Sequence, residues 1–253
     1  MVDPDTRRRA EVAPEPPPVV LRYFDARGRA QHVRNYFACR EIAYADERVA
    51  LSPGFEAWQA IRGDRAVAGP FHKLPVLHWG DQIVAETSVI YAFLHRSTGD
   101  EALLSEGENL RHAMLFSSLY MDVMMPIGIL IWADLMFRGL DVAAYAKAAL
   151  ARIRGHFGTL DRTLEEWQWG RNAEKRPVML VDCTLWEEID IVRHVFGEHL
   201  RLHEFATLSR IYHEAPGRAV FERLIATHPA SVTGRGLASE GETLAKIREL
   251  IAA

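Results

Sequence analysis

The chain has 253 residues, 49% hydrophobic and 25% charged, which is ordinary for a globular protein with one large or two smaller domains. Its formal net charge of −4 gives no reason to expect nucleic acid or an anionic membrane as a partner. The two cysteines, Cys39 and Cys183, are far apart in sequence. They provide no disulfide framework, which suits a reducing cytoplasm.

The first 18 residues, MVDPDTRRRAEVAPEPPP, combine an arginine run with a proline cluster and lack an apolar core. This composition predicts a disordered extension over residues 1–18 rather than a secretory signal. The most hydrophobic region, residues 113–137, has its longest uncharged run at 123–133, interrupted by Pro126. That run is too short to cross a bilayer, so we predict a buried helix and no membrane partner.

Residues 19–97 alternate between strand and helix patterns. β-Branched and aromatic residues favour strands, and apolar residues at helical spacing favour helices. The predicted order is a strand at 19–24, a helix from Arg29, a strand at 42–49, a short helix at 55–61 with an irregular loop after it, strands at 73–77 and 82–85, and a helix at 87–96.

The rest of the chain is predicted to be helical. A polar linker at 98–107 precedes helices at about 109–137, 142–168, 181–195, 204–215 and 217–226. A last helix is predicted at 239–252, because Ser239 and Glu242 have capping-box spacing. The predicted fold is therefore α/β plus all-α: a thioredoxin-like βαβ–ββα domain at 19–97, followed by an all-helical domain at 108–253.

The stretch from residue 71 to residue 94 contains a proline-marked hairpin and a helix start. Pro75 lies inside a β-rich run, and a cis bond before it would expose the backbone of Leu74. Gly80 and Asp81 supply the turn. The helix that opens at Thr87 offers a hydroxyl and free N–H groups, which suit a carboxylate ligand.

Four segments in this order resemble those of the cytosolic glutathione transferases, and the resemblance covers residues 19–229. It is greatest to the tyrosine-type classes, especially the sigma class. The segments are YFDARGRA at 23–30, Trp58 with Arg62, FHKLPVL at 71–77 and ETSVI at 86–90. The resemblance implies a glutathione transferase that uses glutathione as co-substrate and conjugates it to a small apolar electrophile.

The resemblance implies that Tyr23 and Arg29 are catalytic. A free thiol has a pKa of about 8.5, so glutathione needs help to react as a thiolate at neutral pH. A tyrosine hydroxyl that donates to the sulfur, with a guanidinium nearby, favours the charged form. Without the motif, Tyr23 would be read as packing at a sheet edge and Arg29 as a solvated residue at a helix start.

The glutathione-binding residues are also implied by the resemblance. Leu74, before Pro75, would pair its backbone with the cysteinyl unit as an added strand does. Thr87 and Glu86 would hold the γ-glutamyl end, although both also suit a helix start. The glycyl carboxylate would be held by Trp58, Arg62 and Lys73.

Further implied residues concern the second substrate and a homodimer. Most of the methionine and aromatic stripe in 114–132 is expected to be core, with Tyr120, Met124 and Met125 assigned to the electrophile pocket. Asp122 matches a family acid that reaches across the dimer to the neighbouring glutathione. Phe71 matches an aromatic residue inserted into the partner subunit.

Several features limit the alternatives. Cys39 lies within the first helix and there is no Cys-x-x-Cys, which disfavours cysteine-based and dithiol chemistry. His199 and His203 lack an acidic third ligand, so no metal site is expected. Met179 replaces the usual Ser or Thr three residues before Asp182, which weakens that helix start. Two other functions remain open: a glutathione-dependent isomerase or peroxidase, and a non-catalytic ligand-binding protein.

Overall fold

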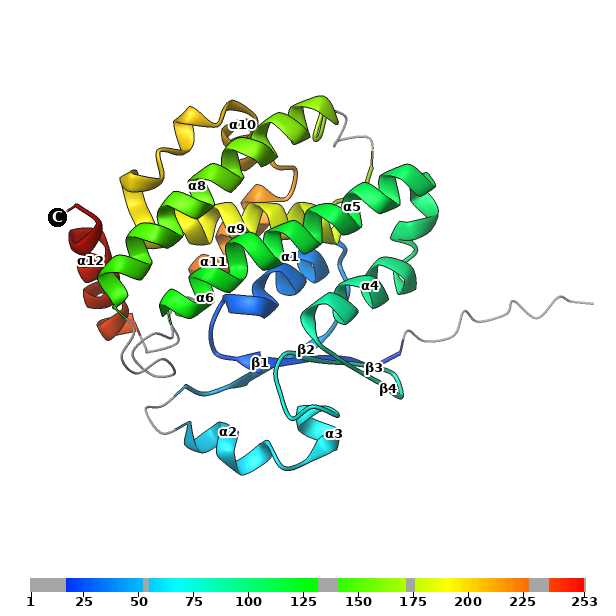
Figure 1. Cartoon of the computed structure of the whole chain (residues 1–253). Helices are drawn as coiled ribbons and strands as arrows, with labels where there is room; N and C mark the ends of the chain where they lie inside the picture. The colour runs from blue at the N-terminus through cyan, green and yellow to red at the C-terminus, as the bar shows by residue number, and fades with distance from the viewer. Residues whose placement is uncertain (1–16, 52–54, 132–140, 172–175, 228–236, 253) are drawn as a thin grey trace, which may run out of the picture.

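The computed structural model describes residues 17–51, 55–131, 141–171, 176–227 and 237–252 (Figure 1). Apart from Pro17 and Pro18, the extension predicted at 1–18 lies outside these residues. The order of elements confirms the predicted fold class, a thioredoxin-like β-α-β–β-β-α unit followed by helices.

A four-stranded sheet forms the base of the N-terminal part. The strands are β1 (Val19–Phe24), β2 (Ala45–Val49), β3 (Val76–Trp79) and β4 (Gln82–Ala85), in the order β2-β1-β3-β4. β1 pairs in parallel with β2 and antiparallel with β3. Every second side chain of β1 is buried, so Leu21 and Tyr23 share the face that meets the core.

Helices lie on both sides of this sheet (Figure 1). α1 (Gln31–Cys39) and α4 (Thr87–Ser97) separate it from the helical part, and α2 (Glu56–Ile61) and α3 (Arg65–Ala68) lie on the other side. α3 corrects the prediction of an irregular loop. Asp64 accepts a hydrogen bond from the Ala66 N–H at 2.8 Å and so caps this short helix.

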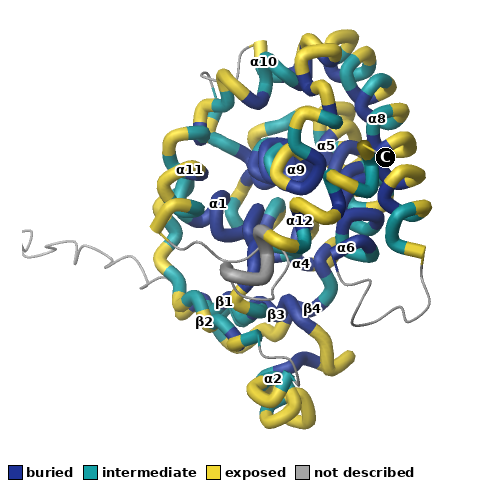
Figure 2. Tube along the Cα trace, turned by 90° about the vertical axis from the view of Figure 1, so that its left-hand side faces the viewer, coloured by how far each residue is buried: buried dark blue, intermediate teal, exposed yellow. Residues whose placement is uncertain are grey.

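The helical part surrounds α9 (Leu180–Phe196), which is buried along almost its whole length (Figure 2). α9 packs on α1 and on several helices of its own half. It therefore joins the two halves of the molecule. The other helices of this half are α5 (Glu106–Leu119), α6 (Met125–Ile131), α8 (Val142–Glu166), α10 (Ala206–Glu214), α11 (Arg218–Thr227) and α12 (Leu237–Ala252).

Four short 3-10 helices lie between the longer elements: η1 (Gly28–Ala30), η2 (Asp100–Leu103), η5 (Gly197–Leu200) and η6 (Leu202–Glu204). Two of them matter for the predicted boundaries. η1 connects β1 to α1, and η2 lies inside the region predicted as a linker.

Several predicted boundaries were wrong. The helix predicted from residue 109 begins at Glu106, within the predicted linker, because Ser105 and Glu108 form a capping box. The strand predicted from residue 42 begins at Ala45. The last helix begins at Leu237, so Ser239 lies inside it rather than at its cap. Residues 132–137 of the long predicted helix fall outside the described part.

The long predicted helix is also interrupted. α5 passes through a π-helical turn, η3 (Tyr120–Met124), before α6 begins. Pro126 follows directly and cannot donate the hydrogen bond that a regular helix would direct to the carbonyl of Asp122. Contrary to the prediction from its uncharged run, the continuous helical stretch Glu106–Ile131 is long and apolar enough, by length and composition, to cross a membrane. Half of its most apolar window is buried inside the protein.

The start of α9 needs no hydroxyl cap. Met179 is fully buried, and its N–H donates to the Asp182 carboxylate at 3.0 Å. Arg176 donates two hydrogen bonds to the same carboxylate, at 2.6 and 2.9 Å. The acid at the third helical position therefore accepts from a backbone N–H that would otherwise be unpaired, while the methionine side chain joins the core.

Candidate functional site

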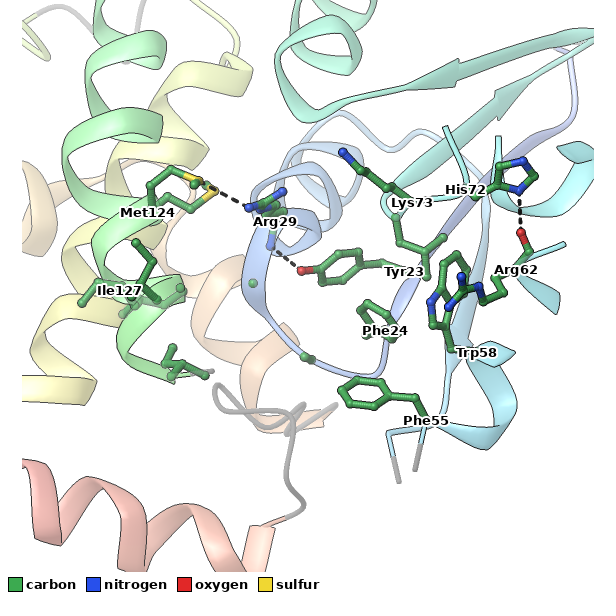
Figure 3. A pocket seen from close by; sticks show the side chains of 18 of the residues that line it. Tyr23, Phe24, Arg29, Phe55, Trp58, Arg62, His72, Lys73, Met124 and Ile127 are labelled. Atoms are coloured by element: carbon green, nitrogen blue, oxygen red, sulfur yellow. Dashed lines mark hydrogen bonds between the residues drawn. The ribbon is translucent and has the colours of Figure 1, made fainter. Parts of the chain in front are cut away.

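A cavity of about 510 Å³ lies between the end of β1 and the helical half (Figure 3). The sheet side contributes aromatic and cationic side chains, and the helical side contributes mostly apolar ones. Eight of the predicted site residues line it: Tyr23, Arg29, Trp58, Arg62, Lys73, Leu74, Met124 and Met125.

Tyr23 presents its hydroxyl at the junction of β1 and η1. The Arg29 N–H donates to the Tyr23 Oη at 3.2 Å, so the hydroxyl oxygen acts as an acceptor and its own proton remains available. Burial raises the pKa of Tyr23, and the Arg29 N–H and the charges of Arg29 and Arg34 oppose this rise. The hydroxyl is therefore neutral at physiological pH and can donate.

Gly28 allows the close approach of the backbone to this hydroxyl. Its φ is +36°, and a Cβ on it would lie 2.6 Å from the Tyr23 Oη. No side chain fits in that space. The glycine is therefore part of the local geometry that places the Tyr23 hydroxyl against the N–H of Arg29.

The Arg29 guanidinium reaches from η1 towards α6. Its Nη2 donates to the Met125 Sδ at 3.3 Å, and its Cζ lies 5.7 Å from the centre of the Tyr120 ring. Figure 3 shows Arg29 between Tyr23 and the side chains of α6 and η3. Tyr120, predicted to line the pocket, is therefore a neighbour of Arg29 and is not among the lining residues of this cavity.

Cationic residues gather at the other end of the cavity. Arg62 donates to Gln59 Oε1 at 3.2 Å, and the His72 Nδ1 donates to the Arg62 carbonyl at 2.6 Å. Lys73 follows His72 in the lining, and Trp58 packs edge-on against Phe24 with ring centres 5.7 Å apart. Two cationic side chains beside an indole suit a carboxylate ligand.

The Leu74–Pro75 peptide bond is cis, as the sequence suggested. Within the described part of the chain, no backbone hydrogen bond engages the Leu74 N–H. Leu74 lines the cavity, whereas Pro75 does not. An extended ligand could therefore pair with the backbone at Leu74.

Glu86 and Thr87 lie outside the lining of this cavity. Glu86 adopts φ 70° and ψ 127° at the N-terminus of α4. The Thr87 hydroxyl is buried and has no hydrogen-bond partner in the described structure. An unsatisfied buried hydroxyl at the start of an eleven-residue helix is well suited to a carboxylate.

Two further predicted residues lie away from the cavity. The Asp122 carboxylate accepts from Arg152 Nη2 at 2.7 Å, and both side chains are partly exposed. Phe71 is 59% exposed, which is high for a large aromatic side chain. Neither residue contacts the cavity within this single chain.

Sequence reasoning missed three polar residues of the cavity lining, Gln59, His72 and Glu188, and the ion pair beside Glu188. Glu188 lines the cavity from α9 and is fully buried. Its neighbour Glu187 accepts from Arg27 Nε at 2.9 Å, and Asp190 accepts from Arg27 Nη2 at 2.6 Å. Burial alone would lower the pKa of Arg27. The negative charges of Glu187 and Asp190 have the larger combined effect, so the pKa of Arg27 is raised. Consecutive acids in a helix normally indicate a solvated face, so the sequence carried no signal for this burial.

No group of three or more His, Cys, Asp or Glu side chains is placed to hold a metal ion among the residues that the structure describes.

Comparisons with known proteins agree with the fold. No family model matches the chain. A curated relative, the glutathione S-transferase of Plasmodium falciparum (isolate 3D7), is 34% identical over 79 residues, which are 31% of this chain and 36% of the relative. The match thus spans little more than a third of that relative's length.

Solved structures match over most of the chain. The Pi-class glutathione S-transferase of Onchocerca volvulus has a TM-score of 0.65 at 20% identity and covers 86% of this chain and 99% of its own. Monomeric Na-GST-3 of Necator americanus, a glutathione S-transferase, has a TM-score of 0.64 at 18% identity (82% and 97% covered). Rat hPGDS complexed with a quinoline has a TM-score of 0.63 at 21% identity, and the match covers 82% of this chain and 97% of its own. The chain therefore has the glutathione S-transferase fold.

Proposed function

We propose that this chain is a tyrosine-type glutathione transferase, most similar to the sigma class, that adds the glutathione thiolate to a small apolar electrophile. One observation carries the proposal. The buried Tyr23 hydroxyl accepts from the Arg29 N–H at 3.2 Å and keeps its proton available at the cavity wall. The fold and the curated relative support the same reading.

In the proposed reaction, Tyr23 donates a hydrogen bond to the sulfur of bound glutathione. A donor to the charged form lowers the thiol pKa, and a thiol pKa lower by one corresponds to about 1.4 kcal/mol of preference for the thiolate. The positive charge of Arg29 adds to this preference. The thiol proton passes to solvent, and the thiolate attacks an electrophile held against Met124 and Met125. The apolar helical wall favours apolar second substrates.

Glutathione would lie along the sheet side of the cavity. Its cysteinyl unit would pair with the backbone of Leu74. The glycyl carboxylate would face Arg62 and Lys73, with Trp58 beside it. The γ-glutamyl end would reach Thr87, whose buried hydroxyl lacks a partner in the described structure, and Glu86 would accept from its α-amino group.

Isothermal titration with glutathione, combined with a conjugation assay read by product mass, tests this proposal. We expect saturable binding and a product whose mass is the sum of the two substrates, less any leaving group. Binding without conjugation of epoxides, halides or enones would favour a non-catalytic protein. Turnover of a substrate without a glutathione adduct would favour an isomerase or peroxidase. No binding would refute the proposal.

The proposed function also includes a homodimer that is located in the cytoplasm. Large apolar side chains are exposed at Phe71, on α4 at Val89, and on α5 and η3 at Leu110, Met114 and Met121. A second copy would cover such side chains. Cys39 and Cys183 are free thiols, which suits a reducing compartment.

A further inference from the structure

Glu188 is an unusual group for the wall of an apolar cavity. It lies in the middle of α9, its side chain is fully buried, and it belongs to the cavity lining. Neither of its carboxyl oxygens has a hydrogen-bond partner in the described structure. An unpaired polar group in such a place costs stability, so it points to a ligand rather than to a structural role.

The surroundings of Glu188 favour its protonated form. The guanidinium of Arg27 is already engaged by Glu187 and Asp190, at 2.9 and 2.6 Å. Burial first and the charge of Glu187 second raise the pKa of Glu188 well above its usual range, and the smaller effect of the Arg27 charge opposes them. A neutral carboxylic acid has one O–H to donate, unlike a carboxylate, which only accepts.

Glu188 lines the cavity, yet its oxygens are closed to solvent. The helical side of the same lining also includes Ile127 and Ile191, together with Met124 and Met125. Methionine side chains adapt readily, so this wall can rearrange around a bound substrate.

We propose that Glu188 is a neutral proton donor that selects electrophiles in which thiolate attack moves negative charge onto an oxygen, as in α,β-unsaturated carbonyl compounds. This inference rests on the proposed function. It names the chemical class of the second substrate and a catalytic residue on the helical wall, opposite the sheet residues that would hold glutathione.

In the proposed step, the thiolate forms a bond from sulfur to the β-carbon, and the electron pair of the carbon–carbon double bond moves to give an enolate oxygen. The Glu188 hydroxyl transfers its proton to that oxygen, and the resulting enol tautomerises to the saturated carbonyl product. After the product leaves, the Glu188 carboxylate takes up a proton from water that enters the cavity, replacing the one that glutathione released.

The test compares two electrophiles in the full-length protein. Thiolate attack on trans-4-phenyl-3-buten-2-one places negative charge on an enolate oxygen, whereas attack on benzyl chloride releases it as a chloride ion. General acids typically contribute a hundredfold or more. In Glu188→Leu we expect the ratio of kcat/KM for the enone to kcat/KM for benzyl chloride to fall at least about tenfold. Glu188→Gln, which keeps a donor without a transferable proton, should keep the enone KM and lose kcat.

A matched control is Glu198→Leu, the same change at an exposed glutamate of η5, which should alter neither reaction. Equal losses with both electrophiles, or no loss with the enone, would overturn the role of Glu188 while leaving the proposed function intact. A wild-type protein that conjugates neither electrophile and does not bind glutathione would refute both. Failure of Glu188→Leu to fold would indicate a structural role and also count against the proposal.

Discussion

At the scale of single residues, the Tyr23 hydroxyl depends on the missing side chain of Gly28. A Cβ at Gly28 would come within 2.6 Å of the Tyr23 Oη, at a φ of +36°. Gly28→Ala should therefore push the hydroxyl away from the Arg29 N–H and lower the conjugation rate at least about tenfold, since small misplacements at a reacting centre are costly. It should also cost about 1 kcal/mol or more of unfolding free energy.

Kinetic assays and urea denaturation would measure both effects. Gly63→Ala is the control, because no atom lies within 4 Å of a Cβ at Gly63 and its φ is not in the left-handed region. Wild-type rates in Gly28→Ala would show that the contact between glycine and hydroxyl is unimportant.

The raised pKa of Glu188 should make the free energy of unfolding depend on pH. Its folded-state pKa is raised by burial first and by Glu187 second, so its contribution to stability is complete below the unfolded pKa of about 4.3 and is lost as the pH rises towards the folded pKa. We expect Glu188→Gln to unfold at a higher temperature than wild type, by a margin that grows between about pH 5 and pH 8. Thermal unfolding across that range measures it, and a constant margin would contradict a raised pKa.

Some candidate site residues could be assigned from the sequence, whereas others are distinguished only by contacts formed in the folded chain. Tyr23 and Arg29 were assigned because the segment YFDARGRA at 23–30 resembles a family motif, and their local pattern alone would not have selected them. Glu188 has no such pattern, because what distinguishes it is burial by helices far away in the chain. Thr87 could be assigned from its place at a helix start, but its unsatisfied hydroxyl is visible only in three dimensions.

At the scale of elements, α9 is attached to the sheet side by a buried ion pair. Arg27 and Glu187 are almost wholly buried and lie 2.9 Å apart. Arg27→Met should lower the unfolding free energy by about 3–5 kcal/mol, because it leaves a buried carboxylate without its partner. The double variant with Glu187→Met should lose clearly less than the sum of the single variants.

Urea denaturation of the four proteins completes this cycle. Arg201→Met removes an exposed pair with Glu204 and serves as a control, with an expected change of at most about 1 kcal/mol. Strict additivity in the Arg27 and Glu187 variants would contradict their coupling.

Element types could be predicted from sequence more reliably than element ends. Apolar spacing identified the long helices, because their buried faces repeat every turn. It did not detect α3, which has only four residues and too few turns to show a period. It also missed η3, although Pro126 marks the place where the regular hydrogen-bond pattern must fail.

At the scale of the whole molecule, the cavity exists only because two separately patterned halves meet. β1 and η1 contribute one wall, and η3, α6 and α9 contribute the other. Sequence reasoning could place residues on each half, but not the packing of α9 on α1 that brings the halves together. For this reason the sequence assigned more of the lining residues on the sheet side than on the helical wall.

The exposed apolar side chains predict the oligomeric state. Val89 and Met114 are exposed by 53% and 46% on α4 and α5. We expect light scattering to give twice the chain mass of 28.6 kDa, and the variant Val89→Glu/Met114→Glu to give the monomer, since buried unpaired charges oppose association. Ala219→Glu, an exposed site on α11, should remain dimeric. A monomeric wild-type protein would contradict the dimer.

The central claim is that Tyr23 stabilises the thiolate of bound glutathione. The most direct measurement is a pH titration of the ultraviolet absorbance of the bound thiolate in wild type and Tyr23→Phe. Tyr44→Phe is the control, a tyrosine outside the cavity lining. We predict that Tyr23→Phe raises the thiol pKa by about one or more, equivalent to at least about 1.4 kcal/mol, with little change in glutathione affinity. An unchanged thiol pKa in Tyr23→Phe would contradict this role of Tyr23.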